Sequence, residues 1–186
     1  MMADYLLTAA QMLAIPGPAI CLSDNLGAGF WASFFAWGIR EHEQGFYNHA
    51  FCLLAPGRCV SQNWKCEQEP LSDYLDGKHR VKIWAIKGLT EYQSGAIRAA
   101  LVDDARAGRR YNWVGIIGQW TGWRSLGLPG RDYCSEYAAQ IMRMFDPDAA
   151  AGLGDHPAPS EIDAFCKLHP ERYYVAGIFD PYQDAQ

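Results

Sequence analysis

A chain of 186 residues with 49% hydrophobic and 13% aromatic content can bury one sizeable core, so one domain spanning residues 1–186 is expected. The net charge of -5 and the single basic cluster, Arg106, Arg109 and Arg110, argue against nucleic acid as a partner. The six cysteines include no Cys-x-x-Cys pair, and a core of this size does not need disulfides, so reduced thiols are expected.

The N-terminal residues 1–15 are apolar, but they carry Asp4, lack lysine and arginine, and run into Pro16-Gly17-Pro18. This pattern is a poor match to a signal peptide, and it predicts a short helix packed on the domain. We therefore expect a protein that is cytoplasmic as synthesised, or one that is phage-encoded or exported without a signal peptide.

The most hydrophobic run spans residues 26–39 and follows a short predicted strand at residues 19–22. Its fourteen residues are too few to cross a bilayer, so no transmembrane segment is predicted. A buried or cleft-lining helix is expected there. The alternative is an apolar wall presented to an acyl chain or to a membrane surface.

Two runs with strand character, residues 49–54 and 59–64, flank a Pro-Gly turn and predict a β-hairpin. If the turn is centred on this dipeptide, Phe51 faces Gln62 and His49 faces Trp64. Because side chains alternate between the two faces of a sheet, these four side chains then share one face.

His49 is the candidate base in this hairpin. Gln62 lies diagonally across the ladder from it, within reach of a long side chain, and a shift of the turn by one residue would place the two directly opposite. An amide that binds one imidazole nitrogen leaves the other available to exchange a proton. The alternative for both residues is a purely structural role.

The remaining pattern predicts an α+β fold, because the predicted strands are largely consecutive. The loop after the hairpin, in which Glu67, Glu69 and Asp73 surround Pro70, is expected to be solvated. An alternating strand at residues 81–87 precedes a helix at residues 91–107 with Thr90 as its N-cap. The cysteine spacing does not match a zinc site, so no metal is expected.

A glycine-rich loop at residues 118–130 carries Trp120 and Trp123 and leads into a predicted helix. Asp132 suits the N-cap, which places Cys134 at the second helical position. Backbone N–H groups and the helix dipole there favour a thiolate and can stabilise an oxyanion, although Glu136 opposes this effect if it faces the sulfur. The alternative is a small buried cysteine at a helix start, with tryptophans that cover the core.

The order of these parts resembles the circularly permuted branch of the NlpC/P60 papain-like superfamily, which includes YiiX-like, YaeF-like and lecithin:retinol acyltransferase-like proteins. The segments that carry the resemblance are Tyr47-Asn48-His49-Ala50, Val60-Ser61-Gln62, Tyr133-Cys134-Ser135-Glu136 and Pro159-Ser160-Glu161-Ile162. The resemblance implies a papain-like fold, with an antiparallel sheet packed against helices. Gln62 departs from it, since glutamate is common at that position.

The resemblance also implies a cysteine peptidase or amidase that cuts an amide or isopeptide bond of a cell-wall-type peptide and needs no cofactor. Cys134 would be the nucleophile, His49 the general base and Gln62 the orienting third member. The expected substrate-binding residues are Tyr47, Trp64, Trp120, Trp123 and Tyr133. Two alternatives stay open: a lipid-directed thioesterase or acyltransferase, and an inactive binding module of the same fold. The oligomeric state is not predicted.

Overall fold

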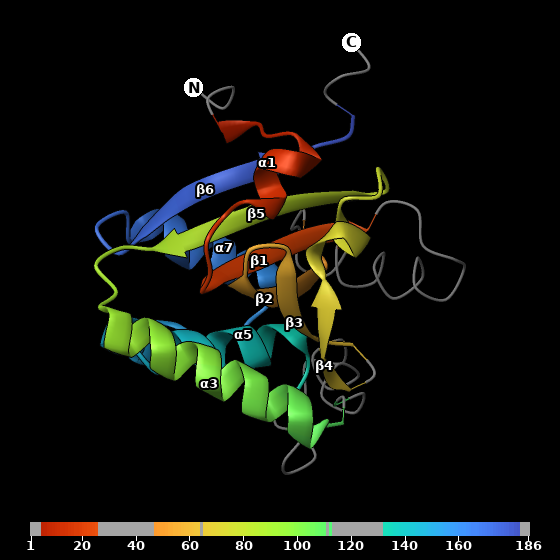
Figure 1. The fold of residues 1–186 in the computed structure, drawn as a ribbon. Helices are drawn as coiled ribbons and strands as arrows, with labels where there is room; N and C mark the ends of the chain where they lie inside the picture. Colours follow the sequence, from red (N-terminus) through yellow and green to blue (C-terminus); the bar gives the residue numbers. More distant parts are fainter. Residues whose placement is uncertain (1–4, 26–46, 64, 111, 113–131, 183–186) are drawn as a thin grey trace, which may run out of the picture.

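The computed structural model describes residues 5–25, 47–63, 65–110, 112 and 132–182. The strands in this part of the chain form one six-stranded antiparallel sheet in the order β4-β3-β2-β1-β5-β6 (Figure 1). Their bounds are β1 Ala19–Asn25, β2 His49–Ala55, β3 Arg58–Gln62, β4 Cys66–Pro70, β5 His79–Ile86 and β6 Tyr173–Phe179. The prediction of an α+β fold is confirmed.

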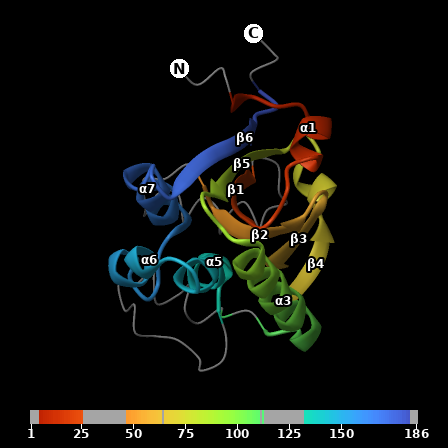
Figure 2. The ribbon, with the colours of Figure 1, turned by 60° about the vertical axis from the view of Figure 1, so that its left-hand side comes forward.

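Helices cover both faces of this sheet. The bounds are α1 Ala9–Leu13, α3 Glu91–Ala107, α5 Cys134–Arg143, α6 Pro147–Gly152 and α7 Pro159–Leu168, with a short 3-10 helix, η2, at Leu71–Tyr74. Thr90 caps α3 as predicted, and its side chain accepts the N–H of Gln93. Helices α3, α5 and α7 lie on one side of the curved sheet, and α1 lies on the other (Figure 2).

Two hydrophobic clusters fill the space between the sheet and these helices. The helix-side cluster joins the sheet to α3, α5 and α7, and its members include Ile20, Leu22, Ala50, Cys52, Val60, Trp84, Leu101, Tyr137, Ile141 and Phe165. The α1-side cluster joins the opposite face to α1 and η2, and its members include Met12, Cys21, Phe51, Leu53, Cys59, Leu71, Tyr74 and Ile83. Neighbouring residues of β2, such as Cys52 and Leu53, therefore lie on opposite sides of the sheet.

The segment after the hairpin differs from its prediction. Residues Cys66–Pro70 pair with β3 along their whole length and form the edge strand β4, where a solvated loop was expected. Glu67 and Glu69 are partly exposed on this strand. Charged residues and a terminal proline are common on edge strands, because such strands need protection from further pairing.

A β-bulge in β2 sets the register of the hairpin. Next to the turn, Ala55 pairs with Arg58, as a turn centred on the Pro-Gly dipeptide requires. The register then shifts by one residue between Leu53 and Ala55, so that Phe51 pairs with Ser61. The predicted pairing of Phe51 with Gln62 is therefore wrong, because β2 spends one extra residue in the bulge.

Gly17 lies against this bulge, just before β1. A Cβ atom at this position would stand 2.6 Å from the carbonyl oxygen of Leu54 and 2.7 Å from its carbonyl carbon, which is closer than a real Cβ atom approaches. The carbonyl oxygen of Gly17 accepts a hydrogen bond of 2.6 Å from the Arg98 guanidinium of α3. The bulge is thus packed directly against the chain that enters the sheet.

Candidate active site

Cys134 is the first residue of α5 and is 5% exposed. The N-cap is Tyr133 and not Asp132, so the cysteine stands one position earlier in the helix than predicted. The reason is local: Glu136 reaches back to accept the N–H of Tyr133 at 2.8 Å, which completes the N-terminal turn. The first helical position lies at the positive end of the helix dipole.

A second histidine is bound to this same turn. The carboxylate of Glu136 forms an ion pair with Nδ1 of His156, and the ring of His156 stacks on Tyr133 with centroids 6.3 Å apart. Burial raises the pKa of the Glu136 carboxyl, while the bonds from Tyr133 and His156 oppose this shift. Among the described histidines, His156 is the one whose hydrogen-bond, ion-pair and ring contacts reach the start of α5.

His49 lies in a different environment. Its Nε2 shares a hydrogen bond of 2.9 Å with the Ser61 hydroxyl, and its ring stacks on Phe51 and Tyr74 with centroid distances of 5.7 Å and 6.0 Å. Burial, with a smaller contribution from His79, lowers the pKa of His49 to about 4. The ring is therefore neutral at pH 7.

Neutral His49 should make the fold sensitive to acid. Because its folded-state pKa of about 4 lies below the ordinary 6.5, only the unfolded chain takes up this proton between those values. Neutral His49 therefore makes its whole contribution to the free energy of unfolding above pH 6.5. This contribution, up to about 3 kcal/mol, is lost as the pH falls toward 4. Urea denaturation near pH 7 and near pH 4.5 measures how far the free energy of unfolding falls between these pH values. The fall should be about 2–3 kcal/mol larger for the wild type than for His49→Gln. Equal drops would contradict this assignment.

The structure does not bring His49 together with Cys134. Phe51 and Tyr74, on which His49 stacks, belong to the α1-side cluster, whereas α5 packs in the helix-side cluster. Since side chains alternate along β2, His49 and the helix that carries Cys134 are on opposite faces of the sheet. In the described part of the chain, the His49 ring therefore faces away from the helix that carries Cys134.

Gln62 is also separated from His49. It lies two residues from Val60 on the helix side of β3, is 1% exposed, and donates its amide to the carbonyl oxygen of Arg109 at 3.2 Å. Ser61 takes the place that was expected for Gln62, and the Tyr74 hydroxyl donates to it at 3.0 Å. Sequence reasoning missed Ser61 because the bulge has no signature in the spacing of the hairpin.

The expected binding residues divide into two groups. Tyr47 is 9% exposed in the helix-side cluster, where burial raises the pKa of its hydroxyl, and Tyr133 is 2% exposed beside Cys134. Both are therefore largely core residues. The predictions for Trp64, Trp120 and Trp123 lie outside the described residues.

The cysteines and carboxylates in the described ranges form no group of three or more metal-ligating side chains. All six cysteines are buried thiols. The helices of the described part include none that is long and apolar enough to cross a membrane.

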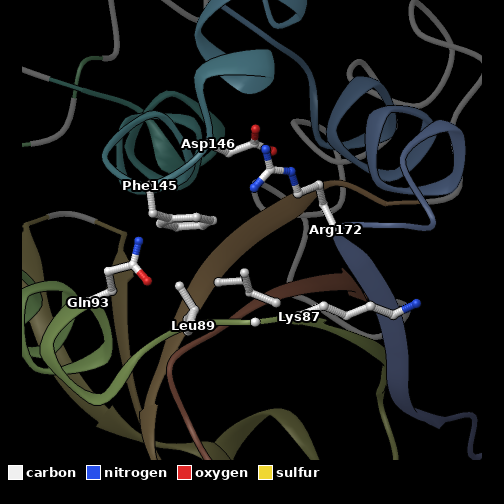
Figure 3. Close-up of a pocket in the computed structure, with 8 residues that line it drawn as sticks. Lys87, Leu89, Gln93, Phe145, Asp146 and Arg172 are labelled. Atoms are coloured by element: carbon white, nitrogen blue, oxygen red, sulfur yellow. The ribbon is translucent and has the colours of Figure 1, made fainter.

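One hollow near α5 lies at the wrong end of that helix for Cys134. It is lined by Phe145 and Asp146, which follow α5, together with Leu89, Gln93 and Arg172 (Figure 3). A helix of ten residues is about 15 Å long, so this hollow is well separated from the first turn. It is not part of the candidate site.

No protein-family model matches this sequence, and no curated protein matches it. The case for a function therefore rests on the chemistry at the start of α5.

Proposed function

We propose that the chain is a thiol hydrolase built on a papain-like plan, with Cys134 as its nucleophile. The observation that carries the proposal is that Cys134 opens α5 while the Glu136–His156 pair is anchored in the same turn. A cysteine at a helix start on a sheet, with an oriented imidazole nearby, is the arrangement that activates a thiol for covalent catalysis.

His156 takes the role of general base in this proposal, in place of His49. Glu136 holds Nδ1 of the ring, which assigns Nε2 to proton exchange. A carboxylate that orients an imidazole also stabilises the imidazolium that forms when the thiol is deprotonated. Glu136 thus supplies the third function that was expected of Gln62.

The chemistry follows from these roles. His156 accepts the thiol proton, and the Cys134 sulfur attacks the substrate carbonyl carbon to form a tetrahedral oxyanion beside the N–H groups at the start of α5. The C–N bond breaks, the amine leaves with the proton from His156, and a thioester remains. Water, deprotonated by His156, then attacks the thioester and releases the acid and the thiol.

The substrate proposed is the amide or isopeptide bond of a cell-wall-type peptide, as the family resemblance implies. Hydrolysis of peptidoglycan fragments should be compared with that of p-nitrophenyl esters of increasing chain length. Rates that rise steeply with ester chain length would favour a lipid-directed thioesterase over the amidase.

A second candidate is an inactive binding module of the same fold. The observation that favours it is the position of His49, whose ring packs in the α1-side cluster, away from the helix that carries Cys134. In that case the strand histidine is a packing residue and Cys134 is an ordinary buried thiol.

Selective alkylation separates the two candidates. Near pH 6, iodoacetamide should modify Cys134 at least about tenfold faster than the other five thiols, because burial raises the pKa of each of those. Mass spectrometry of tryptic peptides identifies the modified residue. His156→Gln should slow the modification, whereas His49→Gln should not. Uniformly slow labelling of all six thiols would support the binding module.

A further inference from the structure

Arg109 stands between the hairpin and the helix that carries Cys134. It follows α3, where Gly108 adopts a left-handed conformation with φ of 59° and turns the chain toward the sheet. The carbonyl oxygen of Arg109 accepts the N–H of Cys66 at 2.8 Å and the amide of Gln62 at 3.2 Å. These two bonds tie its backbone to the ends of β3 and β4.

The side chain of Arg109 reaches the segment that precedes α5. Its guanidinium lies 2.7 Å from the carboxylate of Asp104 and 3.7 Å from that of Asp132, which is two residues before Cys134. The other carboxylate oxygen of Asp132 accepts the amide of Gln140 at 2.7 Å. The two acidic side chains are 17% and 15% exposed, whereas the side chain of Arg109 is 43% exposed.

This arrangement affects the electrostatic environment of the Cys134 thiol. A carboxylate near a thiol disfavours the thiolate, and Asp132 stands two residues before Cys134 in the chain. The Arg109 guanidinium, 3.7 Å from that carboxylate, offsets part of its charge, and the amide of Gln140 holds the carboxylate in place. Among the described residues, the ion pairs place Asp132, Arg109, Glu136 and His156 at the first turn of α5, with Asp104 bound to the same guanidinium.

We propose that Arg109 is a positioning residue for Cys134, which acts by keeping a positive charge beside Asp132. Gln62 supports it by holding the backbone of Arg109 in place. The inference rests on the proposed function, because it assigns to Arg109 the role of favouring the thiolate form of the proposed nucleophile, Cys134.

Titration of the Cys134 thiol tests this role. The thiolate absorbance of each protein is followed against pH, with the matching Cys134→Ser protein subtracted. Arg109→Met should raise the pKa of Cys134 by about 0.5–1 unit, and Arg109→Lys should keep most of the wild-type value. In an Asp132→Asn background, the shift caused by Arg109→Met should fall to less than half. Arg106→Met is the matched control, because this exposed arginine faces Asp103 and should leave the pKa unchanged.

Each outcome decides between the mechanisms. If Arg109→Met shifts the pKa of Cys134 equally in the wild-type and Asp132→Asn backgrounds, Arg109 acts directly or through the whole fold, and the proposal is overturned. The absence of any shift also overturns it. A wild-type thiol that titrates at or above the ordinary value of about 8.5 overturns the proposed function instead. The dependence of the Arg109 effect on Asp132 is read separately from that value, so the two failures are distinguishable.

Discussion

Replacement of Cys134 by serine should lower the hydrolysis of peptidoglycan fragments by about a thousandfold or more, because the hydroxyl is a far weaker nucleophile at neutral pH. His156→Gln should cause a loss of similar size, because His156 transfers a proton both when the thioester forms and when water hydrolyses it. Non-additive effects are expected: the double variant should be about as slow as either single variant, because residues that act as a unit fail together. Released amine is the quantity to measure.

The matched control is His49→Gln, which removes an imidazole of the opposite sheet face. It should retain activity within about threefold of the wild type at pH 7, where His49 is neutral and partly buried. Circular dichroism of each variant establishes that the fold is intact. A His49→Gln protein that is inactive but folded, beside an active His156→Gln protein, would reverse the assignment of the base.

The second large effect concerns stability. Asp163 of α7 is 6% exposed and binds Lys82 at 2.8 Å, Trp84 at 2.8 Å and Lys167 at 2.6 Å. Burial lowers the pKa of Lys82 even beside this carboxylate. Burial alone would raise the pKa of Asp163, but the bonds from Lys167 and Lys82 hold it below its usual range. The ion pair between Lys82 and Asp163 joins β5 to α7, and both of its side chains are largely removed from water.

Asp163→Ala should therefore lower the free energy of unfolding by about 3–5 kcal/mol, because it leaves the ammonium of Lys82 buried without its counter-ion. The double variant Asp163→Leu, Lys82→Met should recover most of this loss, since it replaces the pair with apolar groups of similar volume. Urea denaturation monitored by tryptophan fluorescence measures both. A loss below about 1 kcal/mol in Asp163→Ala would show that Lys82 finds water or another partner.

Helices, strands and turns could be predicted from the sequence where a few neighbouring residues determine them. The cap at Thr90, the hairpin turn and the alternation in β5 each gave the correct element, because each depends on a few neighbouring residues. The site was readable only in part. The place of Cys134 in the first turn of a helix was predicted, but the strand neighbours of His49 depend on a bulge that no residue pattern indicates.

The partner of Cys134 in the proposed mechanism was missed for a different reason. His156 lies between α6 and α7, outside any motif that the sequence analysis used. A signal did exist: Glu136 stands three residues after the N-cap, where a carboxylate completes a capping box and leaves one oxygen for another partner. Nothing local indicates that this partner is a histidine twenty residues further on.

The contact between Gly17 and the bulge has a consequence for how this hairpin can vary among related chains. Any side chain at position 17 would have to displace the backbone at Leu54, so the bulge and the glycine are expected to be inherited together. A descendant that straightens β2 would regain the freedom to change position 17. A deletion of Leu54 would leave Leu53 opposite Cys59 and Phe51 opposite Ser61, so the ladder would become straight while Ser61 stayed beside His49.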